Sequence, residues 1–187
     1  MLSTLGLFSA VSAAAGDFPE NNTIYIETSE GIGSIYSYQQ GKEKFYLATE
    51  PDGSTTIIVL NTETGAISVD GEIISYQLDA VAIPSMFANA KDNWGPERTT
   101  DYTIPLDGMS EIAITAVLMA YGVHDIPAGM VAALVSQQIP VLYYRVKLRY
   151  NYVDYSPKVG IRQTDQFFWH GGFTAVPDAE RTVTYVK

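Results

Sequence analysis

Residues 111–139 combine helical spacing with side chains that are apolar on nearly every side. Ser110 and Asp125 are placed to cap two helices, which we predict over residues 111–121 and 126–139. Because the connection between them is short, the two helices should form an antiparallel hairpin. A helix without a polar face has to be buried on all sides, in protein or in lipid. The rest of the chain must therefore cover this hairpin, or a membrane must.

Two interpretations of the hairpin stay open. Each arm has only about 11–14 residues, fewer than the roughly 20 that span a bilayer. The first interpretation is a hairpin buried as core against sheets. The second is a membrane-active hairpin that is sheltered in the soluble form and inserts at a lipid target. In the second case the membrane or partner contacts are apolar side chains of both arms: Ile112, Val117, Leu118, Val131 and Leu134.

The chain before the hairpin is predicted to form an antiparallel β-meander over residues 21–79. Short apolar runs alternate there with turn signals, and Asp70-Gly71 is the clearest of these signals. Asp-Gly tolerates the positive φ angles of a tight hairpin turn, and such short connections force antiparallel neighbours. Residues 80–108 are less regular: residues 84–90 are compatible with a short helix, and residues 93–97 are predicted to form a long loop. The expected strands cover residues 23–27, 34–38, 45–49, 55–61, 66–69 and 72–78.

The chain after the hairpin returns to strands. Residues 142–152 alternate between large apolar side chains at even positions and mainly basic ones at odd positions, which include Arg145, Lys147 and Arg149. A period of two is that of a strand with one buried face. We expect residues 158–168 to pair back on this strand and residues 182–186 to add another. The predicted fold class is α+β: a β-meander, an apolar antiparallel helical hairpin and a C-terminal antiparallel sheet.

The N-terminus predicts export. Residues 1–15 are uncharged, apolar or small, and end in small residues typical of a signal-peptide cleavage site. The chain has no cysteine, which excludes a disulfide framework and thiol chemistry and fits a bacterial exoprotein. We therefore expect a signal peptide over residues 1–15, a single domain over residues 16–187 and a secreted, extracellular protein. The sequence does not indicate an oligomeric state.

Charge argues against nucleic acid as a partner. The net charge is −10, and an acidic majority repels phosphate backbones. The basic residues are concentrated at the end of the chain, where residues 140–187 carry 7 basic and 4 acidic side chains. This asymmetry is expected when two oppositely charged parts of one domain pack together.

The aromatic run at residues 167–172 is a second candidate site. On a strand, neighbouring residues point to opposite faces, so one aromatic pair could be exposed. Exposed aromatic rings bind sugars, peptides or membrane interfaces. The candidate binding residues are Phe168, Trp169 and His170. The alternative is that these rings close the core beside the terminal strand.

No catalytic motif is visible in the sequence. Signatures of serine hydrolases, zinc proteases and nucleotide-binding loops are absent, and the chain has two histidines. We predict no cofactor and no metal, and a non-catalytic protein; a hydrolase is the less favoured alternative. The Ala/Gly-rich apolar helices beside Tyr-rich strands over residues 109–155 resemble some bacteriocin-like exoproteins of Gram-positive bacteria. That resemblance, which is one of composition, implies action on a membrane. The other functional hypothesis is an extracellular module that binds a cell-surface glycan or protein through its aromatic C-terminal sheet.

Overall fold

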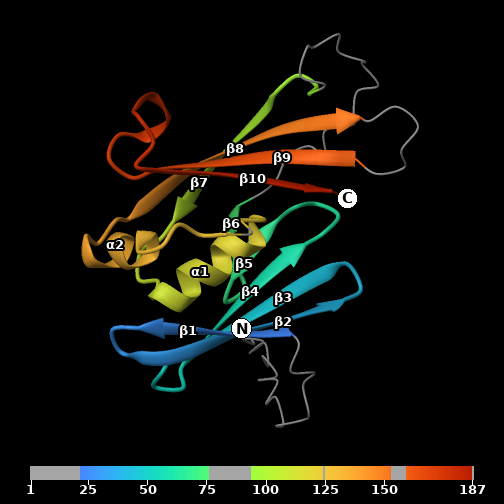
Figure 1. Ribbon diagram of the computed structural model, residues 1–187. Helices are drawn as coiled ribbons and strands as arrows, with labels where there is room; N and C mark the ends of the chain where they lie inside the picture. The colour runs from blue at the N-terminus through green and yellow to red at the C-terminus, as the bar shows by residue number, and fades with distance from the viewer. Residues whose placement is uncertain (1–21, 76–93, 124, 153–158, 187) are drawn as a thin grey trace, which may run out of the picture.

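The protein forms two antiparallel sheets with two short helices between them (Figure 1). The computed structural model describes residues 22–75, 94–123, 125–152 and 159–186. The six-stranded sheet contains β1 (Thr23–Thr28), β2 (Gly31–Gln40), β3 (Glu43–Thr49), β4 (Thr55–Asn61), β5 (Ile67–Val69) and β6 (Glu72–Ser75). The four-stranded sheet contains β7 (Arg98–Pro105), β8 (Val141–Tyr152), β9 (Val159–Phe168) and β10 (Ala179–Val186). The helices are α1 (Glu111–Ala120) and α2 (Met130–Ser136).

The six-stranded sheet follows the order of the chain, β1-β2-β3-β4-β5-β6, and every neighbouring pair is antiparallel. The turn between β5 and β6 is formed by Asp70 and Gly71, whose φ angles are 48° and 86°. The prediction of a hairpin at this dipeptide is therefore confirmed. The predicted meander is confirmed in part, for the described strands up to Ser75; its last residues, 76–79, lie outside the described part of the chain.

The four-stranded sheet has the order β10-β9-β8-β7, again with antiparallel neighbours. The alternation predicted for β8 is confirmed: Leu142 and Tyr144 are fully buried, while Arg145 lies on the opposite face. Strand β7 was not predicted, because its sequence lies in residues 80–108, where no regular pattern indicates a strand. Its pairing with β8 completes one edge of this sheet.

Helix α1 confirms the first arm of the predicted hairpin. The Ser110 hydroxyl accepts a hydrogen bond from the Ala113 N–H at 3.1 Å, which satisfies an N–H of the first turn. The helix ends at Tyr121, and Gly122 continues the chain with a φ of 83°. Seven of its ten residues are buried.

The second arm differs from the prediction. Helix α2 covers residues 130–136 only, instead of 126–139. Gly129, at a φ of 73°, forms the N-cap in the left-handed region, and Gln138 follows the helix at a φ of 52°. These two backbone angles shorten the helix at both ends. The arms are in contact, but α2 has 7 residues rather than the longer second arm expected over residues 126–139.

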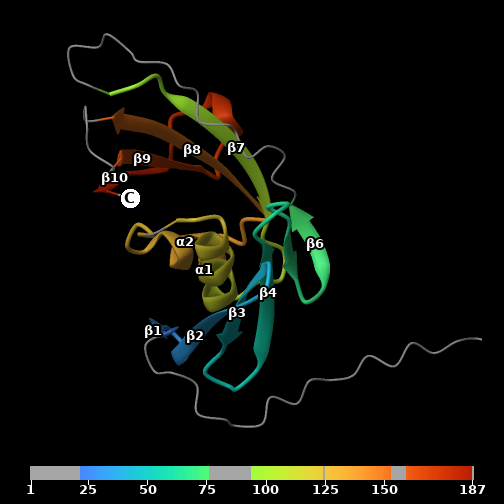
Figure 2. The same ribbon diagram turned by 90° about the vertical axis from the view of Figure 1, so that its right-hand side faces the viewer.

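The two helices lie between the sheets (Figure 2). Helix α1 packs on the inner faces of β2, β3 and β4, and one hydrophobic core draws on both helices and both sheets. The sheets approach each other where β6 contacts β7. This arrangement gives each sheet an inner face against the helices and an outer face.

Two expectations concern membranes and export. Within the described ranges, no helix has the length and hydropathy needed to cross a membrane. The predicted signal peptide, residues 1–15, lies outside the described residues.

Candidate functional site

The large hydrophobic side chains that stay exposed in the described part of the chain are concentrated on the six-stranded sheet. Val176 is the exception. The others are Ile24, Tyr25, Ile32, Tyr38, Ile57 and Ile73, and all but Ile24 lie on the outer face. The outer face of this sheet therefore exposes apolar side chains from one edge to the other.

Seven apolar residues of this face, on strands β2, β3, β4 and β6, form a surface that we call the outer patch. Strand register places Tyr36, Leu47 and Ile57 in one row across the sheet. The next row contains Tyr38 with Phe45 and Val59, and it continues through Ser68 to Ile73. The rings are stacked: centroids of Tyr38 and Phe45 lie 4.8 Å apart, and those of Tyr36 and Tyr38 lie 5.6 Å apart. The outer patch consists of Tyr36, Tyr38, Phe45, Leu47, Ile57, Val59 and Ile73.

The outer patch faces away from the helix. The inner face of the same strands carries Ile35, Ala48 and Ile58, which are 0–1% exposed in the core with α1. The core is therefore closed without the outer patch. Antiparallel sheets with one solvated face usually alternate between apolar and polar residues. These strands are apolar on both faces, which is the pattern of a sheet that is covered on both sides.

Charge on this outer face is confined to its margins. Glu27 pairs with Ile32 at one end, and Glu43 pairs with Asn61 at the other. The Asp70 carboxylate accepts a hydrogen bond from the Ile57 N–H at 2.8 Å beside the patch. None of the strand residues on this face is basic. The outer patch is thus an uncharged area whose rim is mostly acidic, with Lys42 beside Glu43 paired to Glu63.

The outer face of the four-stranded sheet is different. It carries Arg145, Lys147, Arg149 and Arg162 among threonines. The Arg145 guanidinium pairs with Asp101 at 2.6 Å. This is the polar face expected of a sheet in contact with water. The apolar outer face is therefore specific to the six-stranded sheet.

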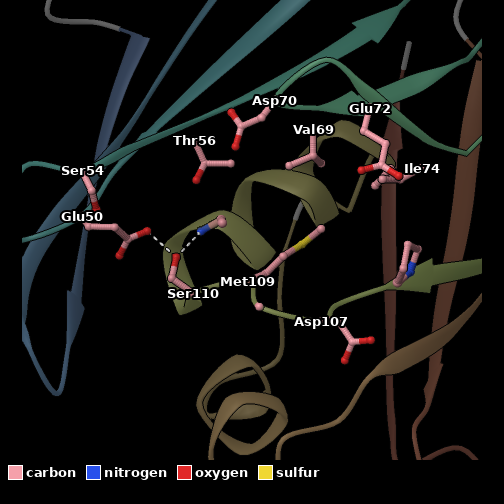
Figure 3. A pocket seen from close by; sticks show the side chains of 13 residues that line it. Glu50, Ser54, Thr56, Val69, Asp70, Glu72, Ile74, Asp107, Met109 and Ser110 are labelled. Carbon is pink, nitrogen blue, oxygen red and sulfur yellow. Dashed lines mark hydrogen bonds between the residues drawn. The ribbon is translucent and has the colours of Figure 1, made fainter.

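A pocket of about 490 Å³ lies beside the N-terminus of α1 (Figure 3). Among the described residues, its lining includes no basic side chain and four carboxylates: Glu50, Asp70, Glu72 and Asp107. Two of these acids have structural partners. Glu50 accepts a hydrogen bond from the Ser110 hydroxyl, and Asp70 accepts one from the Ile57 N–H. These carboxylates make the electrostatic potential in the pocket negative, which favours the binding of positively charged groups.

The chemistry of this pocket is limited. Over the described ranges no three acidic or histidine side chains lie close enough together to hold a metal ion. Among the described residues no histidine lines the pocket, and the Ser110 hydroxyl, which donates to Glu50, also serves as the cap of α1.

The hairpin residues of the membrane hypothesis lie inside the protein. Ile112, Val117, Leu118 and Leu134 are 0–1% exposed. Val131 is half-buried on α2. In this arrangement a membrane could reach the buried side chains only if α1 left the space between the sheets.

The aromatic candidates near the end of β9 have three different environments. Phe168 is 1% exposed, beneath Arg145 and the Phe173 ring. Trp169 is half-buried against the core. His170 is exposed, and its imidazole contacts Asp178 at 2.7 Å. A binding role for the three together stays a prediction, and of the three rings only that of His170 is exposed.

The Asp178 carboxylate stabilises the backbone that follows β9, at Trp169 and His170. Its carboxylate accepts hydrogen bonds from the N–H groups of Trp169 and His170 at 2.6 and 3.0 Å. Burial raises the pKa of Asp178, but these hydrogen bonds outweigh burial and lower the pKa below its usual value. The His170–Asp178 contact is therefore explained by the structure of the turn.

Sequence reasoning missed the outer patch, although a signal was present. Residues 34–38, 45–49 and 55–61 carry large apolar side chains at both odd and even positions. Such strands are expected where both faces are covered.

Comparisons with known proteins add no relative. No protein-family model matches the chain, and neither a curated protein nor a solved structure matches it significantly. The function must therefore be argued from the outer patch and from the rest of this geometry.

Proposed function

We propose that the protein is an exported, non-catalytic binding protein whose outer patch holds a protein partner. The observation that carries this proposal is the seven-residue apolar surface on a face that the core does not need. Contiguous exposed apolar surface of this kind marks interaction sites in soluble proteins. The patch contains three aromatic residues, a class that is enriched at protein interfaces.

The chemistry of the patch favours protein over glycan or lipid. Sugar sites combine aromatic rings with polar groups that bind hydroxyls, whereas this patch carries four aliphatic side chains. A membrane surface with anionic lipids would repel a chain of net charge −10 whose patch has a mostly acidic rim. The complementary partner is a protein with an apolar surface and a basic rim.

Site-specific crosslinking tests this proposal. A photoreactive phenylalanine at Tyr38, which is 37% exposed, should crosslink one extracellular protein when the chain is exported by its own cells. The same probe at Thr164, on the outer face of the four-stranded sheet, is the matched control. The captured protein is then purified and titrated against the wild-type chain and against Ile57→Lys.

Saturable binding that weakens about 10-fold or more in Ile57→Lys supports the proposal, since hot-spot residues cluster at the centre of an interface and their loss costs about 2 kcal/mol or more. Equal crosslinking from Tyr38 and Thr164, or equal affinity of the two chains, contradicts it. An unfolding midpoint close to that of the wild type shows that Ile57→Lys is folded, as its 45% exposure leads us to expect.

The membrane-active hairpin remains a second proposal. Its support is the composition of α1, which has apolar or small side chains at eight of ten positions. It requires α1 to leave a core in which Ile112, Val117 and Leu118 are fully buried. Dye release from vesicles by the exported protein would favour this second proposal over a binding protein.

A further inference from the structure

Strand β1 is an edge strand of the six-stranded sheet. Within the described part of the chain it pairs with β2 alone. The most exposed apolar side chains of this sheet gather here. Tyr25 is 76% exposed and Ile32 is 66% exposed on the outer face, while Ile24 is 43% exposed on the inner face. Apolar side chains thus emerge on both faces of the same edge. One further strand alongside β1 would cover both faces at once.

The edge at β1 carries one charged side chain, Glu27, and otherwise lacks the features that normally prevent edge pairing. Proteins protect such edges with lysine, proline, bulges or inward-pointing charges. β1 contains no basic residue and no proline, and its pairing with β2 has no register shift. Strand β10, an edge strand of the four-stranded sheet, carries Glu180 and the inward-facing Arg181, which pairs with Asp125. Of these two edges, β1 is the one suited to pairing.

We propose that β1 pairs antiparallel with β1 of a second copy of this chain, so that two six-stranded sheets become one continuous sheet. A two-fold axis perpendicular to the sheet keeps inner and outer faces aligned. Residues directly opposite each other must then lie on the same face, which leaves few symmetric registers.

The register centred on Tyr25 is the one that fits. It places Tyr25 opposite Tyr25 of the second copy on the outer face, and Ile24 opposite Ile26 twice on the inner face. Thr23 lies opposite Glu27, so no two like charges meet. A register centred on Glu27 would oppose two carboxylates, and one centred on Ile26 would place Tyr25 opposite Glu27. Cross-strand aromatic and β-branched pairs stabilise a sheet, whereas opposed like charges destabilise it.

This self-complementarity identifies the strand that pairs with β1 as β1 of a second copy. A strand of an unrelated protein would need a matching pattern, whereas β1 supplies its own. The inference does not depend on the outer patch, because β1 contributes no residue to it. Loss of partner binding and loss of dimerisation can therefore be measured separately.

Sedimentation velocity over a range of concentrations tests the proposal. The wild-type chain should change from the mass of one chain to that of two as its concentration rises. Tyr25→Glu and Tyr25→Lys, each alone, should keep the mass of one chain, because residue 25 opposes itself. An equimolar mixture of the two variants should recover the dimer, because opposite charges then face each other. Ile57→Lys, on the same sheet but away from β1, is the control and should dimerise like the wild type.

Several results would overturn the proposal. One is a wild-type chain with the mass of one copy at every concentration. Another is dimerisation of Tyr25→Glu and Tyr25→Lys each on its own, which would place the interface elsewhere. A mixture that stays monomeric would exclude the self-opposed register. If either Tyr25 variant unfolds, Ile24→Lys provides a second disruption through an inward-pointing charge at the edge, and it should also abolish the dimer.

Discussion

Gly33→Ala tests whether α1 is seated on the six-stranded sheet as described. Gly33 lies on the inner face of β2, where a methyl group has no space. A Cβ added there would lie 1.9 Å from Cδ1 of Ile112 and 2.5 Å from the carbonyl oxygen of Thr49. The side chain of Ile112 can shift, but the Thr49 carbonyl belongs to β3, which is paired on both sides. The new methyl group must therefore displace either the helix or a backbone held by the sheet.

The expected cost is at the upper end of the overpacking range, about 3 kcal/mol of unfolding free energy. For a chain of this size that corresponds to a melting temperature lower by roughly 6–12 °C. Ile112→Val alone should cost about 0.5–1.5 kcal/mol, since it removes one buried methyl group. Because that methyl group is Cδ1, the double variant should be more stable than the sum of the two single changes predicts.

Equilibrium denaturation of the wild-type chain, the two single variants and the double variant measures this coupling. A positive coupling of about 1 kcal/mol or more shows that the two side chains contact each other. A Gly33→Ala variant with the midpoint and m-value of the wild type would refute the reasoning. Helix α1 would then not contact β2 at Gly33, and the layered core would be wrong.

The remaining predictions concern buried polar groups. Tyr144→Phe should lower the free energy of unfolding by about 1–3 kcal/mol in urea titrations. The reason is that the Tyr144 hydroxyl donates to the Asp165 carboxylate at 2.6 Å and both groups are buried. A cost below about 0.5 kcal/mol would show that this hydrogen bond is not formed. Burial raises the pKa of Tyr121 from its usual value of 10.0 to about 12. Its contribution to stability should therefore be complete below about pH 10 and be lost as the pH rises from about 10 to 12. Tyr121→Phe should flatten that part of the pH profile, and an unchanged profile would contradict the assignment.

Parts of the fold follow directly from local sequence. The alternation along β8, the Asp70-Gly71 turn and the cap of α1 are local signals, and each predicts its element. The bounds of α2 are set by the left-handed conformations of Gly129 and Gln138, which side-chain periodicity does not reveal. Strand β7 depends on its pairing with β8, a contact between segments distant in the sequence.

The candidate site was harder to predict for a related reason. Two-sided apolar strands indicate that both faces of the sheet are covered, but the sequence does not say which face the helix takes. Once α1 is placed on the face of Ile35 and Ile58, the opposite face becomes the surface without a cover. The apolar helices attracted the functional hypothesis because their composition is conspicuous, whereas in the structure most of that apolar surface is core.

Hydrogen exchange of the backbone amides tests the central claim of the account most directly, which is that the helical pair is core rather than the functional surface. The measurement compares the exported protein alone with the protein in the presence of anionic and of zwitterionic lipid vesicles. We predict that the amides of α1 exchange among the slowest in the chain and at the same rate in all three conditions, because the helix stays between the sheets. Loss of protection in α1 when vesicles are added would contradict the account and favour the membrane-active hairpin.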